Sequence, residues 1–245
     1  MADRSKEIEY KLSEYPKVKY NMFKHSVFHD LLEKASNEQL AYMEDFFDDE
    51  VEIIFSDSRA GTGKTFITVA CCYADYLNHN KNMTFVIAPV SDDIGALPGS
   101  KFSKESVFFS GLYDALDELG LAAERTIFEM TQEEENINKE MFSHCWVHAV
   151  SHVHMRGANV NCNLVCEESQ NFKRNELKKV LTRVKEGSTV CVVGSSIQID
   201  LKNEAKSGFI PYLEHFKKYP EARFHTLNQN FRSRLSNFAD DFKWE

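Results

Sequence analysis

The chain has 245 residues, a length that suits one large domain and allows a sizeable buried core. Hydrophobic residues make up 42% of it and charged residues 27%, as in an ordinary soluble globular protein. No apolar run reaches the ~20 residues of a membrane-spanning helix, and the first residues lack the apolar stretch of a signal peptide. The sequence therefore predicts a cytoplasmic protein without a membrane partner.

The formal net charge is −9, so a nucleic-acid partner would have to bind a local basic surface rather than the protein as a whole. The six cysteines lie in apolar runs and show no disulfide-type spacing. They are expected to be buried thiols.

Along the chain, the polar residues 1–24 are expected to form a loosely attached segment, and helical spacing begins at His25. Strand-like apolar runs then follow at Val51 to Phe55, Met83 to Ala88, Trp146 to Val150, Cys162 to Cys166, Ser188 to Val193 and Arg223 to Leu227. Segments with helical spacing alternate with them at Thr65 to Leu77, Ser110 to Leu121, Leu177 to Val184 and Ser233 to Phe242. This alternation predicts an α/β fold with a mostly parallel sheet and a ligand at the carboxyl ends of its strands.

A phosphate-binding loop is predicted between the first strand and the helix that follows it. The pattern G-x-x-x-x-G-K-[ST] matches residues 58–65 except at its first position, where Ser58 replaces glycine. Ser58 is compatible with the loop if its φ is negative. The residues expected to bind nucleotide phosphates are Ala60, Gly61, Thr62, Gly63, Lys64 and Thr65.

Each of these residue types has a chemical reason to be in such a loop. Glycines let backbone N–H groups turn toward phosphate oxygens, and the following helix points its positive end at them. Lys64 is expected to reach the β- and γ-phosphates, and the Thr65 hydroxyl to bind Mg²⁺. The alternative is a glycine-rich turn followed by Lys-Thr by chance, which the strand before and the helix after disfavour.

A second site is predicted where the strand ending at Cys166 is followed by two acids. In this Walker B arrangement Glu167 would support Mg²⁺, and Glu168 would act as the general base that activates the attacking water. Glu167 stands where most such strands have aspartate. The alternative is a solvated acidic start of a helix.

Two further residues are candidates for stabilising the transition state. Gln198 follows the next buried strand and would sense the γ-phosphate or position water. Arg232 lies in LNQNFRSR and would stabilise charge on the transferred phosphoryl group. A plain loop glutamine and a surface arginine are the respective alternatives.

With these motifs in hand, the chain resembles the PhoH-like ATPases from about Asn37 to its end. The similar segments are AGTGKT, IGALPGS, GLYDAL, MRGANV, EESQN and LTRVKEGSTVCVVGSSIQIDL, in that order. The departures are Ser58 and Arg59 for Gly-Pro, Glu167 for Asp, and Ser195 for Asp.

The resemblance implies a RecA-like core over residues 37–245, related to superfamily 1 helicases, preceded by a helical extension over residues 1–36. It implies hydrolysis of ATP with Mg²⁺ in a homo-oligomer with a ring shape. It further implies that Gln39 reads adenine, which suits an amide with both a donor and an acceptor. RNA or single-stranded DNA is the expected partner.

Two other clusters have ordinary interpretations. His144, Cys145, His148, His152 and His154 fit no common zinc spacing and are interpreted as strand or surface residues. A basic run between Lys173 and Lys185 would contact phosphates or simply form the solvated face of a helix, which its apolar stripe favours.

Three functions remain open from the sequence. The first is an ATP-driven protein acting on RNA or single-stranded DNA, with Glu168, Lys64, Gln198 and Arg232 as catalytic residues. The others are a nucleotide-binding scaffold with little turnover and a P-loop kinase for a small molecule.

Overall fold

The computed structural model describes residues 2–23, 27–89, 104–133, 144–155, 157 and 159–240. The predicted connection from Pro89 to Lys104, with the segment IGALPGS, lies almost entirely outside these ranges. Arg156 and Ala158 of MRGANV also lie outside them.

A six-stranded parallel sheet forms the centre of the molecule, in the order β3-β2-β4-β5-β1-β6. The strands are β1 (Ile53–Asp57), β2 (Met83–Ile87), β3 (Val147–Ser151), β4 (Asn163–Cys166), β5 (Val190–Gly194) and β6 (Ala222–His225). All six predicted strands are confirmed, with boundaries shifted by one or a few residues. The prediction of a parallel sheet in an α/β fold is therefore correct.

Helices connect and cover the strands. The α-helices are α1 (Ala2–Leu12), α2 (Val27–Lys34), α3 (Asn37–Phe46), α4 (Lys64–His79), α6 (Ser110–Glu118), α7 (Ala123–Thr126), α8 (Phe128–Glu133), α10 (Arg174–Leu181), α11 (Phe209–Phe216) and α12 (Arg234–Asp240). Short 3-10 turns are η1 (Tyr20–Phe23), η3 (Ser106–Phe109), η4 (His152–Met155), η5 (Ser169–Asn171) and η6 (Glu204–Lys206). Within the described ranges, no helix has the length and apolar character needed to cross a membrane.

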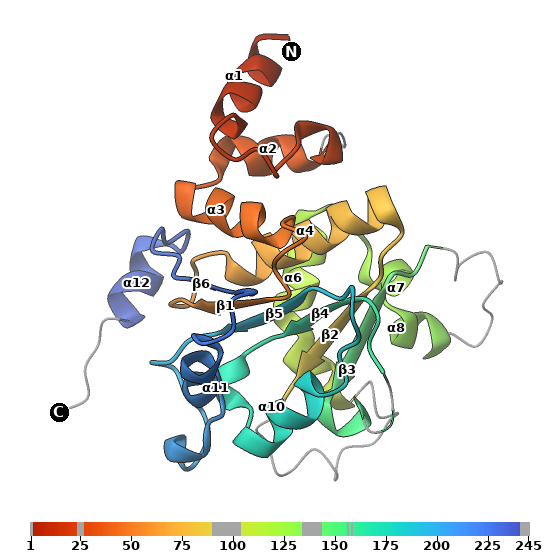
Figure 1. Cartoon of the computed structure of the whole chain (residues 1–245), viewed down its shortest axis with the longest axis vertical. Coiled ribbons are helices and arrows are strands. Elements are labelled where there is room, and N and C mark those ends of the chain that lie inside the picture. Colours follow the sequence, from red (N-terminus) through yellow and green to blue (C-terminus); the bar gives the residue numbers. More distant parts are fainter. Residues whose placement is uncertain are drawn as a thin grey trace.

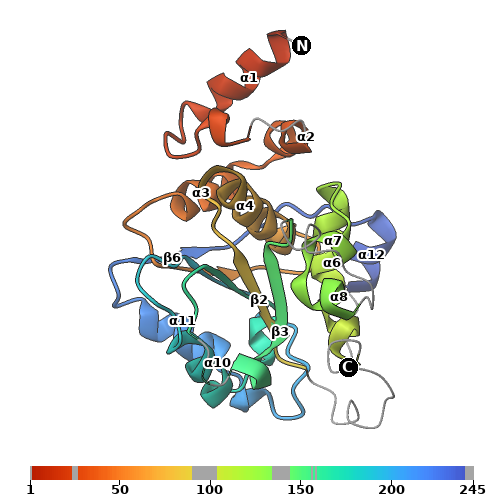
Figure 2. The ribbon, with the colours of Figure 1, turned by 90° about the vertical axis from the view of Figure 1, so that its right-hand side faces the viewer.

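Helices cover both faces of the sheet. Side chains alternate along each strand, so neighbouring residues of a central strand are buried on opposite faces. On β1, Ile54 belongs to the apolar cluster that also contains Ile67 of α4, whereas Phe55 belongs to the cluster that contains Leu177 of α10. Figure 2 shows the sheet between α3 and α4 on one side and α10 and α11 on the other. The result is a three-layer α/β/α core.

The N-terminal segment is attached more firmly than its polar composition predicted. Ile8, Leu12 and Val18 are buried in the cluster that includes α3 and α4. The backbone N–H of Lys17 donates to the Glu44 carboxylate at 2.8 Å. Figure 1 shows α1 and α2 standing above α3 at one end of the molecule. A few apolar residues and several backbone contacts hold this segment, so the expectation of loose attachment is wrong.

The strand order decides where the predicted motifs meet. β5 pairs with β1 on one side and with β4 on the other, in parallel register. The carboxyl ends of these three neighbouring strands therefore lie at one edge of the sheet. The phosphate loop follows β1 and the paired acids follow β4, so both arrive at that edge.

Candidate nucleotide site

The loop from Ala60 to Gly63 has the backbone geometry of a phosphate cradle. Gly61 and Gly63 have φ of 81° and 76°, a left-handed region that glycine adopts without strain. Gly63 is the N-cap of the 16-residue α4, and no side chain caps this helix end. Its first N–H groups are thus available to an anion, and the helix dipole favours negative charge there.

Lys64 supplies a buried positive charge beside this loop. The residue is only 6% exposed. Its Nζ is 3.5 Å from the carbonyl oxygen of Arg59, at the outer limit of a hydrogen bond. A buried ammonium with such a weak contact has strong capacity to bind phosphate oxygens.

Thr65 and Glu167 meet although they come from different motifs. The Thr65 hydroxyl donates to Oε1 of Glu167 at 2.6 Å. The other oxygen, Oε2, is buried and has no hydrogen-bond partner in the described part of the chain. Burial, followed by the nearby charge of Glu168, raises the pKa of Glu167 to about 7. A hydroxyl beside a carboxylate with an unpartnered buried oxygen fits a Mg²⁺ site, since this ion prefers oxygen ligands.

Glu168 adopts a backbone conformation that is unusual for its residue type. Its φ and ψ are 49° and 45°, in the left-handed region. Such a conformation costs about 1 kcal/mol or more in a non-glycine residue and tends to occur at functional sites. The residue is exposed, so its carboxylate faces solvent in the cavity described below.

Gln170 connects the acidic strand tip to the end of β5. Its Nε2 donates to the Glu168 carboxylate and, at 3.0 Å, to the carbonyl oxygen of Gln198. Its Oε1 accepts from the backbone N–H of Ser195 at 3.0 Å. Sequence reasoning quoted this residue within EESQN but gave it no role. Its position two residues after Glu168 was the feature of the sequence that could have indicated a contact with that carboxylate.

Arg232 and Phe231 lie over the phosphate loop. The backbone N–H of Phe231 donates to the carbonyl of Gly61 at 2.8 Å. A Cβ atom on Gly61 would lie 2.4 Å from Cγ of Arg232, so only glycine leaves room for this side chain. Phe231 is 51% exposed, and its ring would lie 3.7 Å from a Cβ on Gly63. The sequence analysis named Arg232 as a candidate and did not name Phe231.

Glu38 and Ser58 hold the segment 227–232, which carries Phe231 and Arg232, in place. The Glu38 carboxylate accepts from the backbone N–H and the side-chain amide of Asn228 at 2.7 and 2.8 Å. These bonds lower the pKa of Glu38, the backbone bond contributing most. Ser58 Oγ accepts from the buried backbone N–H of Leu227 at 2.8 Å. Ser58 has no positive φ, so its side chain fits the loop and ties it to the segment that carries Arg232.

Gln39 lies beside the loop with its amide already engaged. Its Oε1 accepts from the backbone N–H of Ser36 at 3.0 Å, completing the capping box of α3. Its Nε2 donates to the carbonyl of Thr62 at 3.3 Å. The residue therefore braces the loop in addition to any contact with a base.

A cavity of about 800 Å³ gathers most of the predicted site residues. Those lining it are Gln39, Ala60, Gly61, Gly63, Lys64, Thr65, Glu167, Glu168 and Arg232. Thr62 turns its hydroxyl to the carbonyl of Arg59 and lines a neighbouring cavity of about 440 Å³. Gln198 is not among the lining residues of the larger cavity and connects to it through Gln170.

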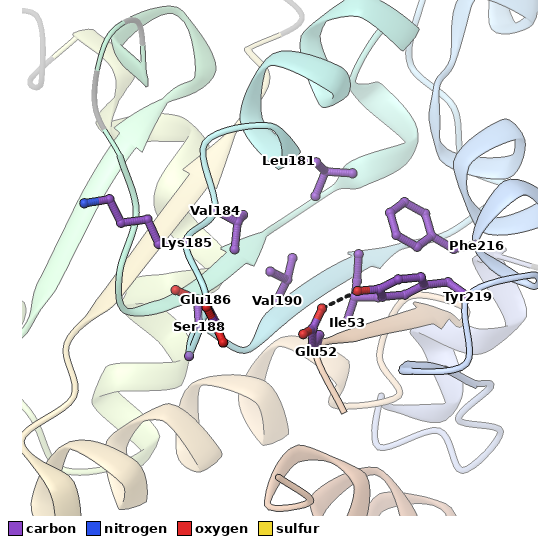
Figure 3. Close-up of a pocket in the computed structure, with 11 residues that line it drawn as sticks. Glu52, Ile53, Leu181, Val184, Lys185, Glu186, Ser188, Val190, Phe216 and Tyr219 are labelled. Carbon is purple, nitrogen blue, oxygen red and sulfur yellow. Dashed lines mark hydrogen bonds between the residues drawn. The ribbon is translucent and has the colours of Figure 1, made fainter. Parts of the chain in front are cut away.

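A third cavity, of about 310 Å³, lies at the opposite edge of the sheet, where β1 and β5 begin. Figure 3 shows its apolar side chains, among them Ile53, Val190 and Phe216, and the hydrogen bond from Tyr219 to Glu52. This bond is the main reason that the pKa of Tyr219 rises to about 12. None of the predicted nucleotide-binding residues lines this cavity.

None of the described residues of the histidine cluster or the basic run lines the 800 Å³ cavity. His148, His152 and His154 each face a different carboxylate, at 3.2, 3.6 and 3.3 Å. In the described ranges no three potential ligands gather around a metal position. On α10, Leu177 and Val180 are buried while Lys178 and Lys179 are exposed, an arrangement that fits both a solvated helix face and a contact with phosphates.

A parallel RecA-like core with a phosphate loop after β1 and an acidic tip after β4 places the chain in the P-loop NTPase fold class. A model of the PhoH-like protein family matches residues 31–239. The chain belongs to the PhoH-like protein family.

Individual relatives agree with this assignment. The chain is 32% identical over 172 residues to a PhoH-like protein of Mycobacterium leprae and 30% identical over 200 residues to Protein PhoH2 of Bacillus subtilis. These matches cover 66% and 79% of this chain but 45% and 43% of the relatives, so the chain spans less than half of their length. The UvsW helicase of bacteriophage T4 aligns with a TM-score of 0.50 at 8% identity, over 78% of this chain and 59% of UvsW. This last likeness concerns the fold alone.

Proposed function

We propose that this protein binds ATP with Mg²⁺, hydrolyses it to ADP and phosphate, and couples turnover to RNA or single-stranded DNA. The observation that best supports hydrolysis is the contact of Thr65 with Glu167, beside Glu168, in the cavity that contains the phosphate loop. A phosphate cradle alone would support binding, whereas a second carboxylate beside it supports attack by water.

In this proposal the backbone amides of residues 60–65 and the Lys64 ammonium bind the β- and γ-phosphates. Thr65 and Glu167 hold Mg²⁺, which neutralises charge on the phosphate oxygens. Gln39 and the half-exposed ring of Phe231 contact the base, since aromatic rings stack well on nucleobases.

Glu168 acts as the general base. Its carboxylate accepts a proton from the water that attacks the γ-phosphorus, while the bond to the ADP oxygen breaks. Gln170 orients this carboxylate and also donates to the carbonyl oxygen of Gln198. Gln198 therefore senses the γ-phosphate indirectly, through Gln170 and Glu168. Arg232 stabilises negative charge on the transferred group, as arginine fingers do.

Fewer observations support the polynucleotide partner than support ATP hydrolysis. Lys178, Lys179 and Lys185 are exposed on and after α10, and such side chains bind phosphate backbones. The RecA-like core is shared with UvsW, which is described as a helicase. We further propose a cytoplasmic homo-oligomer, with a ring as the expected form.

Steady-state ATP hydrolysis with and without RNA or single-stranded DNA tests the proposal. Hydrolysis should require Mg²⁺, rise when polynucleotide is added, and lose that stimulation as salt increases. A mass measurement in solution should give a multiple of the mass of one chain. Hydrolysis that no RNA or DNA changes at low salt would refute the polynucleotide coupling and leave the ATPase activity.

A nucleotide-binding protein with little turnover is the second candidate. It is favoured by the absence of Gln198 from the lining of the 800 Å³ cavity and by Ser195, whose buried hydroxyl has no partner in the described residues. Tight ATP binding without phosphate release, with or without polynucleotide, would support this candidate over the first.

A further inference from the structure

The 800 Å³ cavity extends beyond the phosphate loop along α2. Val27, Leu31 and Ala35 line it, together with Lys34. Val27 and Leu31 are four residues apart on α2, and Ala35 follows after four more, so they form one stripe on the same face. A triphosphate needs only the part of the cavity beside Gly61 to Thr65. Asp30 of α2 lines the cavity as well, so the stripe is the apolar part of this wall, available to the remainder of a larger ligand.

Helix α2 is fixed by a residue of α1. The ammonium of Lys11 donates to the carbonyl oxygens of Leu32, Glu33 and Ala35 at 3.2, 3.1 and 2.6 Å. The last carbonyls of a helix have no partner within it, and the helix dipole places negative charge there. One lysine therefore satisfies the carboxyl end of α2.

The same junction continues into the phosphate loop. Ser36 directly follows Ala35 and is the N-cap of α3, with Gln39 completing the capping box. Gln39 in turn donates to the carbonyl of Thr62. The wall formed by α2 is thus held at a fixed position relative to the loop.

We propose that α2 forms the nucleoside side of the ATP site, with Val27, Leu31 and Ala35 against the base and ribose, and that Lys11 is the positioning residue for this wall. The proposal rests on the proposed function, since it assumes a nucleoside triphosphate as the ligand. The flat faces of a nucleobase suit an apolar stripe. The family match begins at residue 31, so Lys11 and the first turn of α2 lie outside it.

Comparison of ATP with inorganic tripolyphosphate tests this wall, because tripolyphosphate carries the phosphates and lacks the nucleoside. Binding of both, with Mg²⁺, is measured on the full chain for wild type, Lys11→Met, Lys11→Arg and Val27→Ser. Lys6→Met is the matched control, since Lys6 is an exposed lysine of the same helix. A thermal melt of each variant reports on folding.

Lys11→Met should raise the Kd for ATP about tenfold, as a wall in place only a tenth of the time would. Val27→Ser should raise it by about the same factor, because it removes the apolar contact itself, worth roughly 1.5 kcal/mol. The Kd for tripolyphosphate should stay within about twofold. Lys11→Arg should keep the Kd for ATP close to that of wild type, because arginine also donates to carbonyl oxygens. Lys6→Met should match wild type for both ligands.

Equal weakening of ATP and tripolyphosphate by Lys11→Met and Val27→Ser would overturn the assignment, because the effect would then lie in the phosphate loop or the fold. Unchanged ATP binding in these variants would overturn it as well. Wild-type protein that binds tripolyphosphate but not ATP would overturn the nucleoside wall and keep the phosphate site. Wild-type protein that binds neither would overturn the proposed function and this inference with it.

Discussion

The hydroxyl of Thr65 donates a 2.6 Å hydrogen bond to the carboxylate of Glu167, across a separation of 102 positions in the chain. Thr65 is the second residue of α4, and Glu167 directly follows β4. Their contact brings a phosphate-binding element and a pair of acids into one site.

Lys64→Ala should weaken ATP binding about 100-fold, the effect of losing a charge-assisted contact of roughly 3 kcal/mol. The physical reason is that the hydrogen bond recorded for the buried Lys64 ammonium within the described residues is weak, at 3.5 Å from the carbonyl oxygen of Arg59. Titration calorimetry with ATP measures the change. Lys218→Ala, which alters an exposed lysine, should bind ATP like wild type. Comparable ATP affinity in Lys64→Ala and wild type would contradict the phosphate site.

Glu168→Gln should keep ATP binding and lower kcat by roughly 100-fold or more, the usual contribution of a general base. The amide keeps the size of the side chain and cannot accept the proton of water. Glu118→Gln is the control, because Glu118 is a carboxylate at the end of α6 that lines the same cavity. Phosphate release at steady state and binding of ATP separate the two effects. Normal turnover in Glu168→Gln would show that another group is the base.

Glu167 should make the stability of the metal-free protein depend on pH. Its pKa is about 7 in the folded protein against a usual 4.5. The stabilisation is therefore fully present below about pH 4.5 and is lost as pH rises through 7, a change of up to about 3 kcal/mol in the free energy of unfolding.

Urea unfolding in chelator measures this dependence on pH. Glu167→Gln should match wild type at pH 5 and exceed its stability at pH 8, because the amide is never ionised. Parallel pH profiles for the two proteins would mean that the folded pKa of Glu167 is not raised.

Gly61→Ala should abolish turnover because its Cβ would meet Cγ of Arg232 at 2.4 Å. Gly120→Ala is a matched control, with φ of 69° and no atom within 4 Å of a new Cβ. Both variants should lose about 1 kcal/mol of stability from backbone strain, and only Gly61→Ala should lose hydrolysis. Equal hydrolysis in both would remove Arg232 from the site.

Ser58→Ala should destabilise the fold by about 1–3 kcal/mol, because it leaves the buried N–H of Leu227 without an acceptor. Ser13→Ala, which removes an exposed hydroxyl, should change stability by less than about 0.5 kcal/mol. Chemical denaturation of both variants gives the comparison. If Ser58→Ala were as stable as Ser13→Ala, the bond to Leu227 would have no structural weight.

The sequence by itself determined the α/β class, the six strands and the phosphate loop. These features depend on local patterns: apolar runs of strand length, and two glycines before a helix. Lys64, Thr65, Glu167, Glu168 and Arg232 were predicted as site residues because each stands within a short motif, and all five line one cavity. The prediction failed for residues 1–24, where the contacts of Lys11 with backbone carbonyls leave no trace in side-chain composition.

Only the tertiary structure decided which distant groups meet. The pairing of β5 between β1 and β4 places Thr65 against Glu167, and no local pattern specifies that order. The link from Gln170 to Gln198, the position of Arg232 over Gly61 and the wall formed by α2 have the same origin. They arise from packing between elements far apart in sequence, whose relative positions the whole core fixes together.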